Sequence, residues 1–507
     1  MRKSKRSNPR ILVVTPEITS LPPGMSSMGS YLRAKAGGLA DVSATLVGAL
    51  YRQGADVHVA LPHYRRMFHI DVGNLINDEL RVYMSHLHNS RIHLAEDRIF
   101  YYRDSVYSSY SSDTFLQSLA FQREVINNII PLVKPDLIHC NDWMTGLIPA
   151  AARRMGIPCL FTVHNIHTQK RTLAEIEDRG IDAAPFWQNL YYERQPYNYE
   201  ESRESNPVDF LTSGIFAAHF INTVSPTFLK EIVDGQHDFV PENIRREISG
   251  KFYAGCASGI LNSPDSGNDP LLDNFLEAKY DSSSHLTAKK VNKIAFQSRT
   301  GLKVDQNAPL LFWPHRLDPV QKGCQLLADL TYETIHRYWD KGVQIAIVAN
   351  GEYQKVFRDI INYHNFYERV MVCDFDEELS HLGFAASDFM IMPSRFEPCG
   401  LPQMACQYYG SLPIVHDTGG LHDTVEHLSA DGESGNGFVF KNYDDGGLRW
   451  GIEEAMRFFD RPENFKSKVV SRVMDEAREK FNHDVTAQSY IKIYESMLDR
   501  PLVVDYK

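Results

Sequence analysis

Residues 394–421 read SRFEPCGLPQMACQYYGSLPIVHDTGGL, and their pattern indicates the fold class of the chain. Glu397 stands two residues before the pair Cys399 and Gly400. The apolar spacing that follows predicts a helix from Leu401 to Tyr409. A turn of this kind, between a buried strand and a helix, is typical of an α/β domain in which helices cover a sheet.

The second half of the stretch repeats the arrangement. A short apolar strand is predicted from Leu412 to Val415, and Gly419 and Gly420 then open another helical pattern. Helix N-termini present free N–H groups and a partial positive charge, so two of them close in sequence make a natural pocket for an anion. Two ordinary glycine turns are the alternative interpretation, and the rest of the chain is needed to decide.

The composition indicates a globular protein with more than one domain. A chain of 507 residues exceeds what one core usually supports, and 43% hydrophobic residues are enough to fill two cores. The formal net charge of −11 argues against a general nucleic-acid or anionic-membrane binder. Any phosphate chemistry therefore needs locally placed Arg and Lys.

The cysteines and the apolar runs point to the cytoplasm. The chain has seven cysteines, scattered and without a C-x-x-C pair, which fits free thiols in a reducing compartment. The basic start is followed by an apolar run too short for a signal peptide, and no run approaches the length of a membrane span. We therefore expect a cytoplasmic protein with no nucleic-acid or membrane partner.

Short apolar runs rich in β-branched residues alternate with amphipathic stretches along the whole chain. The first series of predicted strands is Ile11 to Thr15, Val57 to Leu61, Leu137 to Cys140, Cys159 to Val163 and Phe220 to Val224. The second series is Leu310 to Trp313, Gln344 to Ala349, Val370 to Cys373, Phe389 to Met392, Leu412 to Val415 and Phe438 to Phe440. Continuous hydrophobicity is the mark of parallel strands buried on both faces, so two series predict two doubly wound, Rossmann-like domains.

Two further segments complete this organisation. Residues 258–269 read SGILNSPDSGND, which indicates a linker or domain entry between the two series. The final helical pattern, from Val485 to Leu498, fits either domain by its periodicity alone.

Polar residues stand just beyond the predicted strand ends, where open α/β sheets bind ligands. After the first strand, Lys35 precedes Gly37 and Gly38 at the start of a helical pattern. The glycines allow the backbone to approach a ligand, and the lysine supplies a charge for a phosphate. The pattern is neither a dinucleotide fingerprint nor a Walker loop, and a structural turn with a solvated lysine is the alternative.

Histidine, carboxylate and aromatic residues accompany the third and fourth strands. His139, Asp142 and Trp143 stand at the end of the third strand, and His164 follows the fourth. Such residues suit a sugar, which needs hydrogen-bond partners and a stacking ring. Each histidine by itself is more often a satisfied, partly buried residue. Their spacing supplies no ligand set for a metal, so we expect no metal site.

Arg316 and Lys322 follow the first strand of the second series, six residues apart, with Gly323 before the next helix. Arginine can bind two phosphate oxygens while lysine neutralises the remaining charge, which suits a diphosphate. Glu397 is either a helix cap or a ligand for sugar hydroxyls and for positive charge at an anomeric carbon. Because glycosidases need two catalytic carboxylates and no second one is evident, phosphate departure is favoured over hydrolysis.

Six motifs in this order carry a family resemblance: KAGGLADV, HCNDW, FTVHN, HRLDPVQKG, SRFEPCGL and DTGGLHDTV. The chain resembles the bacterial glycogen and plant starch synthases, glycosyltransferase family 5, over about residues 10–498. The resemblance implies the GT-B fold, in which two Rossmann-like domains face each other across a cleft. It implies a first domain over residues 1–258, a second over 259–483, and a terminal helix over 484–507 that crosses back to the first.

The resemblance also implies an activity. The enzyme would transfer glucose from ADP-glucose to the non-reducing end of an α-1,4-glucan or maltooligosaccharide, with retention and with neither metal nor cofactor. The implied catalytic residues are Glu397, His164, Asp142, Arg316 and Lys322. The implied donor-binding residues are Lys35, Gly37, Gly38, Cys399, Gly400, Leu401, Thr418, Gly419 and Gly420.

The chain departs from the family pattern at four places. The link from Leu21 to Arg33 is longer, and Asn141 replaces the second histidine of H-x-H-D-W. Residues 262–265 read NSPD where the family has N-G-I-D, and residues 318–320 read DPV before Gln321 and Lys322.

Three other functions are weighed against glucan synthesis. One is a retaining GT-B transferase that uses UDP-glucose or a small acceptor, and another is a glucan-binding protein without catalysis. The second is disfavoured because glucan binding needs no diphosphate clamp. A nicotinamide dehydrogenase is disfavoured because the first strand-to-helix turn lacks the dinucleotide glycine pattern.

Overall fold

The computed structural model of the protein describes residues 8–22, 24–25, 32–35, 38–68, 91–107, 111–265 and 267–503. The chain forms two compact units. The first contains the described residues of Met1–Val224, Leu229–Ile260 and His483–Lys507. The second contains Ser225–Phe228 and those of Leu261–Asn482.

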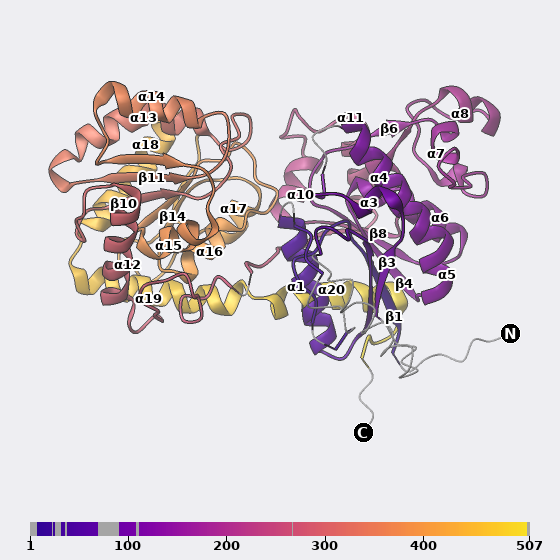
Figure 1. The fold of residues 1–507 in the computed structure, drawn as a ribbon, viewed down its shortest axis with the longest axis horizontal. Coiled ribbons are helices and arrows are strands. Elements are labelled where there is room, and N and C mark those ends of the chain that lie inside the picture. The colour runs from indigo at the N-terminus through magenta and orange to yellow at the C-terminus, as the bar shows by residue number, and fades with distance from the viewer. Residues whose placement is uncertain are drawn as a thin grey trace. The chain divides into compact units, whose positions relative to one another are not determined.

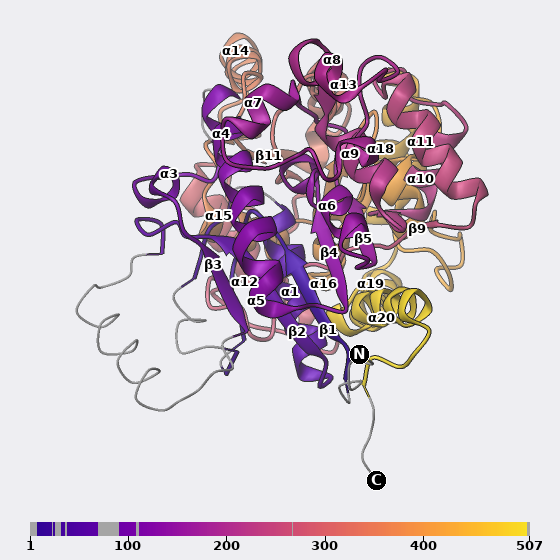
Figure 2. The same ribbon diagram turned by 90° about the vertical axis from the view of Figure 1, so that its right-hand side faces the viewer.

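A seven-stranded parallel sheet forms the centre of the first unit, in the order β3-β2-β1-β4-β5-β8-β9. Figure 2 shows β3, β2, β1 and β4 side by side. The strands are β1 (Arg10–Val14), β2 (Asp56–Pro62), β3 (Ile92–Ala95), β4 (Leu137–Asn141), β5 (Cys159–Val163), β8 (Phe220–Thr223) and β9 (Ala257–Gly259). Residues of β1, β4 and β5 are buried throughout their apolar runs, as parallel strands covered on both faces require.

Helices connect these strands and cover the sheet. The larger ones are α1 (Gly38–Arg52), α4 (Ser111–Glu124), α6 (Ile148–Arg154), α9 (Phe210–Ala217), α10 (Pro226–Val233), α11 (Glu242–Tyr253) and α20 (His483–Leu498). Shorter ones are α3 (Arg98–Tyr101), α5 (Ile130–Val133), α7 (Leu173–Glu177) and α8 (Tyr199–Ser205). A small antiparallel pair, β6 (Lys170–Arg171) with β7 (Val208–Asp209), joins the segment after β5 to the start of α9.

The second unit is built on a six-stranded parallel sheet in the order β12-β11-β10-β13-β14-β15. Its strands are β10 (Leu310–Trp313), β11 (Gln344–Val348), β12 (Val370–Cys373), β13 (Phe389–Met392), β14 (Leu412–His416) and β15 (Phe438–Phe440). Its helices are α12 (His285–Thr300), α13 (Cys324–Arg337), α14 (Gln354–His364), α15 (Glu377–Ala386), α16 (Pro402–Tyr408), α17 (Gly419–Thr424), α18 (Asp445–Phe459) and α19 (Glu463–Lys480).

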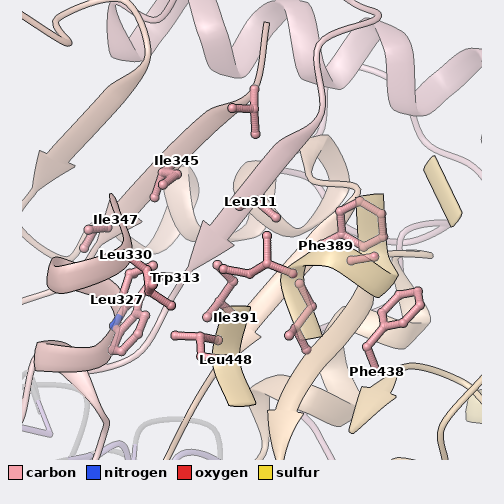
Figure 3. Close-up of a cluster of buried hydrophobic side chains, with 14 of the residues drawn as sticks. Leu311, Trp313, Leu327, Leu330, Ile345, Ile347, Phe389, Ile391, Phe438 and Leu448 are labelled. Carbon is pink, nitrogen blue, oxygen red and sulfur yellow. The ribbon is translucent and has the colours of Figure 1, made fainter. Parts of the chain in front are cut away.

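Successive side chains along the strands of this unit point alternately into two separate hydrophobic cores, one on each face of the sheet. Leu311 and Trp313 of β10 pack with α13, α14 and α18, and Leu310 and Phe312 of the same strand pack with α12, α15 and α16. Figure 1 shows the two groups of helices on opposite faces of the sheet, and Figure 3 shows the first core. The period of two along each strand therefore explains why its run is apolar on both faces.

The strand order reverses once in each sheet, between β1 and β4 in the first and between β10 and β13 in the second. Doubly wound sheets bind ligands outside the carboxyl ends of their strands at this switch point. The segments that follow β1, β4, β10 and β13 are therefore the places to look for a site.

The terminal helix α20 packs within the first unit, beside α1 (Figure 1). Its buried residues Ala487, Tyr490 and Tyr494 follow helical spacing. The Tyr494 hydroxyl lies 2.8 Å from Nδ1 of His139 in β4, and Asn222 of β8 donates to the Tyr490 hydroxyl at 3.1 Å. Periodicity alone had left the helix open to either domain, and these polar contacts attach it to the first sheet.

All eleven predicted strands are present, five of them with identical bounds. Two edge strands, β3 and β9, were not predicted, because His93 interrupts the apolar run of one and the other consists of small residues. One interpretation was wrong: Ser258 and Gly259, assigned to a linker, pair with β8. In the described part of the chain, no helix combines the length and the apolarity needed to cross a membrane.

Candidate active site

A buried ion pair marks the switch point of the second unit. Nζ of Lys322, in the segment after β10, lies 2.5 Å from Oε2 of Glu397, in the segment after β13. The Ser394 hydroxyl donates to the same oxygen at 3.0 Å. The Lys322 and Glu397 side chains are 10% and 6% exposed, so little solvent screens their attraction. Two residues that were predicted separately are thus direct partners.

The turn after β10 places Lys322 and Arg316 differently. The Lys322 amide donates to the carbonyl of Asp318 at 3.0 Å, and the Asp318 carboxylate accepts the amides of Val320 and Gln321. This compact turn directs Lys322 inward. The Arg316 side chain is 74% exposed, and its guanidinium comes no closer than 4.0 Å to the Asp318 carboxylate. The guanidinium is therefore accessible to a ligand.

Gly419 and Gly420 lie against the segment that carries Glu397. A Cβ atom on Gly419 would meet the Glu397 carbonyl oxygen at 2.0 Å, and one on Gly420 would meet the Cys399 oxygen at 2.0 Å. The Gly420 amide also donates to the Glu397 carbonyl at 2.9 Å. These glycines permit close backbone packing, which brings the N-terminus of α17 beside the Glu397 segment.

The rest of this segment leads into α16. Leu401 is the N-cap residue of α16, and Glu397 lies well before it, so the helix-cap interpretation of Glu397 was wrong. Gly400 has a positive φ of 73°, a conformation that favours glycine. Burial raises the pKa of the Cys399 thiol to about 12, so this group is a neutral thiol at physiological pH. Thr418 is the N-cap residue of α17.

Asp142 is the central residue of the first unit's switch point. Its backbone has φ 57° and ψ 179°, a strained conformation for a residue with a side chain. The His164 amide donates to Oδ1 at 2.8 Å, and the Asn165 side chain donates to Oδ2 at 2.9 Å. Burial raises the pKa of Asp142 to about 7, and the nearby negative charge of Glu17 adds to this rise. The two hydrogen bonds act in the opposite direction and lower the pKa.

His164 and His139 have different environments. Nε2 of His164 lies 2.9 Å from Oδ1 of Asn141, and burial lowers the His164 pKa to about 3, so its ring is neutral. His139 is 1% exposed, and both ring nitrogens have partners within the sheet and α20. The structure therefore places His164 beside Asp142 and makes His139 a satisfied core residue.

Two members of this cluster were missing from the predicted site. Glu17 follows β1 and is 1% exposed, and the Tyr107 hydroxyl donates to its Oε1 at 3.2 Å. Glu17 could have been predicted from the sequence, because it stands just past the end of a predicted strand. Tyr107 had none, because it lies in an irregular segment far away in sequence.

The glycine loop before α1 is described in part. Lys35 is 53% exposed, and its Nζ lies 2.9 Å from Oδ2 of Asp41 in the first turn of α1. Gly38 is the first residue of that helix. Gly37 lies outside the described residues, as does part of the long link from Leu21 to Arg33.

The two doubly wound parallel sheets, together with the family matches below, place the chain in the class of glycosyltransferases with the GT-B fold. Residues 10–246 match the starch synthase catalytic domain, and residues 296–469 match group 1 glycosyl transferases. The solved catalytic domain of starch synthase IV from Arabidopsis thaliana, bound to ADP and acarbose, has a TM-score of 0.75 and 25% identity, covering 97% of this chain and 100% of that one.

Curated relatives narrow the class. The glycogen synthase of Clostridioides difficile (strain 630) is 31% identical over 498 residues, which cover 92% of this chain and 97% of that protein. The glycogen synthase of Bacillus subtilis (strain 168) is 30% identical over 492 residues, covering 91% and 95%. The chain belongs to the glycogen and starch synthase family.

Proposed function

We propose that the protein transfers glucose from ADP-glucose to the non-reducing end of an α-1,4-glucan, with retention of the anomeric configuration. The observation that carries this proposal is the buried pair of Lys322 and Glu397, with the accessible Arg316 on the same turn as Lys322. The solved catalytic domain of starch synthase IV, which is bound to ADP and acarbose, supports the proposal.

Arg316 and Lys322 bind the diphosphate of the donor in this proposal. Lys322 has three N–H groups, so it can keep its bond to Glu397 and still donate to a phosphate oxygen. Thr418, Gly419 and Gly420 stand at the N-terminus of α17, whose helix dipole adds a partial positive charge. These groups stabilise the negative charge that develops on the leaving diphosphate.

Glu397 accepts hydrogen bonds from hydroxyl groups of the transferred glucose, and the backbone around Cys399, Gly400 and Leu401 provides further contacts. Because Lys322 bonds to Glu397 directly, one ion pair links the group that binds the sugar to the group that binds the phosphate. As the bond to the leaving group breaks, positive charge develops at the anomeric carbon and negative charge on the leaving oxygen. Glu397 stabilises the first and Lys322 the second.

In the first unit, Asp142 and the neutral ring of His164 contact the transferred sugar, and Lys35, Gly37 and Gly38 contact the donor. With a pKa of about 7, Asp142 is divided between its protonated and ionised forms at neutral pH. It can therefore donate to a sugar hydroxyl or accept from one. This role needs no metal ion and no cofactor.

A donor panel tests the proposal. ADP-glucose and UDP-glucose are each supplied with glycogen and with maltooligosaccharides, and incorporated glucose and the configuration of the new linkage are measured. We expect incorporation from ADP-glucose into α-1,4-linked product. A preference for UDP-glucose, or glucan binding without turnover of either donor, would replace this assignment by one of the alternatives.

A further inference from the structure

We propose that Asn141 is a positioning residue for His164: it holds the His164 ring in the tautomer with hydrogen on Nε2, so that Nδ1 accepts a hydrogen bond from a hydroxyl of the transferred sugar. The assignment of the sugar rests on the proposed function, whereas the tautomer is a property of the protein alone. Asn141 stands where the family pattern has a histidine.

The orientation of the Asn141 amide follows from a backbone contact. Its Nδ2 lies 3.1 Å from the carbonyl oxygen of Val14 at the end of β1. A carbonyl oxygen only accepts hydrogen bonds, so the NH₂ group must face Val14. Oδ1 of Asn141 is then the atom that faces Nε2 of His164, at 2.9 Å. An amide oxygen is an acceptor only, so Nε2 must carry the proton.

The second ring nitrogen is thereby defined. The partly buried His164 ring is neutral, because loss of solvation keeps its pKa near 3. A neutral imidazole with hydrogen on Nε2 carries a lone pair on Nδ1. Within the described part of the chain, Nδ1 of His164 has no protein hydrogen-bond partner. It is a hydrogen-bond acceptor without a donor, at the carboxyl end of β5 next to Asp142.

Asn141 is itself rigidly held. It is the last residue of β4, is 4% exposed, and pairs with Thr162 of β5 in the register of the sheet. Its carbonyl accepts the Thr145 hydroxyl at 2.9 Å. The His164 backbone is fixed by the bond from its amide to Asp142. Both ends of the Asn141–His164 contact are therefore anchored before a substrate arrives, which is the condition for preorganisation.

Three substitutions separate the polarity of Asn141 from its shape. Asn141→Leu keeps the size and removes both polar atoms, so it leaves the tautomer undetermined. Asn141→Asp keeps the shape but places a carboxylate against Nε2, which favours the doubly protonated ring. Asn141→His restores the residue of the family pattern. Thr162→Val is the matched control, because Thr162 is buried in the same sheet and bonds to His139 and Asn222 rather than to His164.

The first measurement needs no substrate. Full-length protein with ¹⁵N-labelled histidine is examined by NMR at pH 7.5, and a His164→Gln sample assigns the His164 signals. We expect an unprotonated Nδ1 and a protonated Nε2 in the wild type and in Thr162→Val. We expect Asn141→Asp to show protonation of both nitrogens and Asn141→Leu to show a mixture. A protonated Nδ1 in the wild type would overturn the proposal.

The second measurement is kinetic. We expect Asn141→Leu to lower kcat at least 10-fold with little change in KM for the donor, and Asn141→His to recover part of that loss. In Asn141→Asp, the acid limb of the kcat profile should move to higher pH, because ring protonation removes the acceptor on Nδ1. Unchanged ring signals and unchanged pH profiles in both variants would refute the role of Asn141. Failure of the wild type to use ADP-glucose would instead refute the proposed function and leave the tautomer result standing.

Discussion

At the scale of single residues, the Lys322–Glu397 pair has the clearest energetic consequence. Removing one member of a buried ion pair leaves an uncompensated charge, which costs about 3–5 kcal/mol. Glu397→Gln keeps the shape of the side chain and leaves Lys322 without its counter-charge. We expect this variant to have a lowered Tm and at least 100-fold lower kcat.

The same variant should respond more strongly to ADP than the wild type does. If Lys322 faces the diphosphate, the anion replaces the missing carboxylate charge, so ADP should raise the Tm of Glu397→Gln by more than it raises that of the wild type. Thermal melting with and without ADP measures the difference. Lys322→Met is the control, because it should abolish the extra stabilisation. An equal shift in Glu397→Gln and the wild type would exclude a direct role of Lys322 in binding the diphosphate.

Asp142 predicts a dependence of stability on pH. Its pKa is about 7 in the folded protein and 3.8 without burial, so the folded state holds this proton more tightly. The stability that the protonated form contributes is fully present below about pH 4 and is lost as the pH rises through about 7. At about 1.4 kcal/mol per pH unit the effect is at most about 4 kcal/mol. Asp142→Asn removes the titration, so its Tm should fall less between pH 5 and pH 8 than that of the wild type, while its activity is lost. Parallel melting curves of the two proteins would contradict the pKa.

The residues past the strand ends could be predicted from the sequence, because parallel strands place their carboxyl ends along one edge. Arg316, Lys322, Glu397, Asp142 and His164 were predicted in this way, and their roles remain predictions. The ion pair of Lys322 and Glu397 could not be predicted, because these residues are 75 positions apart and meet only when β10 and β13 are neighbours in the sheet. The partner of Glu17 was equally hidden, since Tyr107 reaches it from an irregular segment.

At the scale of elements, glycines decide how closely α17 approaches the Glu397 segment. In Gly420→Ala, the new methyl group would overlap the Cys399 carbonyl, which is backbone and cannot turn aside. Overpacking of this kind typically costs about 1–3 kcal/mol. Because the displaced segment carries Glu397, we expect kcat to fall at least 10-fold together with the Tm.

Gly250→Ala is the matched control for that substitution. Gly250 lies in α11, and a Cβ there would meet nothing within 4 Å. Replacing a helical glycine by alanine should stabilise the protein by about 0.5–1 kcal/mol and leave activity unchanged. Wild-type activity in Gly420→Ala would show that the Glu397 segment tolerates a shift. It would contradict the claim that close packing of α17 against this segment is needed for activity.

The central strands were predictable because burial on both faces makes their sequences continuously apolar. The edge strands were not. β9 consists of Ala, Ser and Gly, which lack the β-branched and aromatic side chains that favour strands, and only its pairing with β8 makes it a strand. The helix α17 was predictable from its glycine pair, whereas the contact of those glycines with the Glu397 segment belongs to the tertiary structure.

At the scale of the whole molecule, three segments of the chain form the first unit, and the last of them is built on α20. Tyr494 connects α20 to the earlier part of this unit: it is fully buried, its hydroxyl lies 2.8 Å from Nδ1 of His139, and Nε2 of His139 lies 2.6 Å from the Thr162 hydroxyl. The Thr162 hydroxyl in turn donates to Asn222. The terminal helix is thus joined to three neighbouring strands, β4, β5 and β8, by one continuous set of hydrogen bonds.

This connection predicts that α20 stabilises one unit and not the other. Tyr494→Ala removes a buried ring and should cost about 3–5 kcal/mol, whereas Tyr494→Phe removes only the hydroxyl and should cost about 1–2 kcal/mol. Hydrogen exchange of the full-length variants should rise in α1 and in the strands of the first sheet, and remain unchanged in the second sheet. Because the stabilising contacts of Tyr494 lie within the first unit, equal acceleration in both sheets would mean that the two units unfold as one cooperative body.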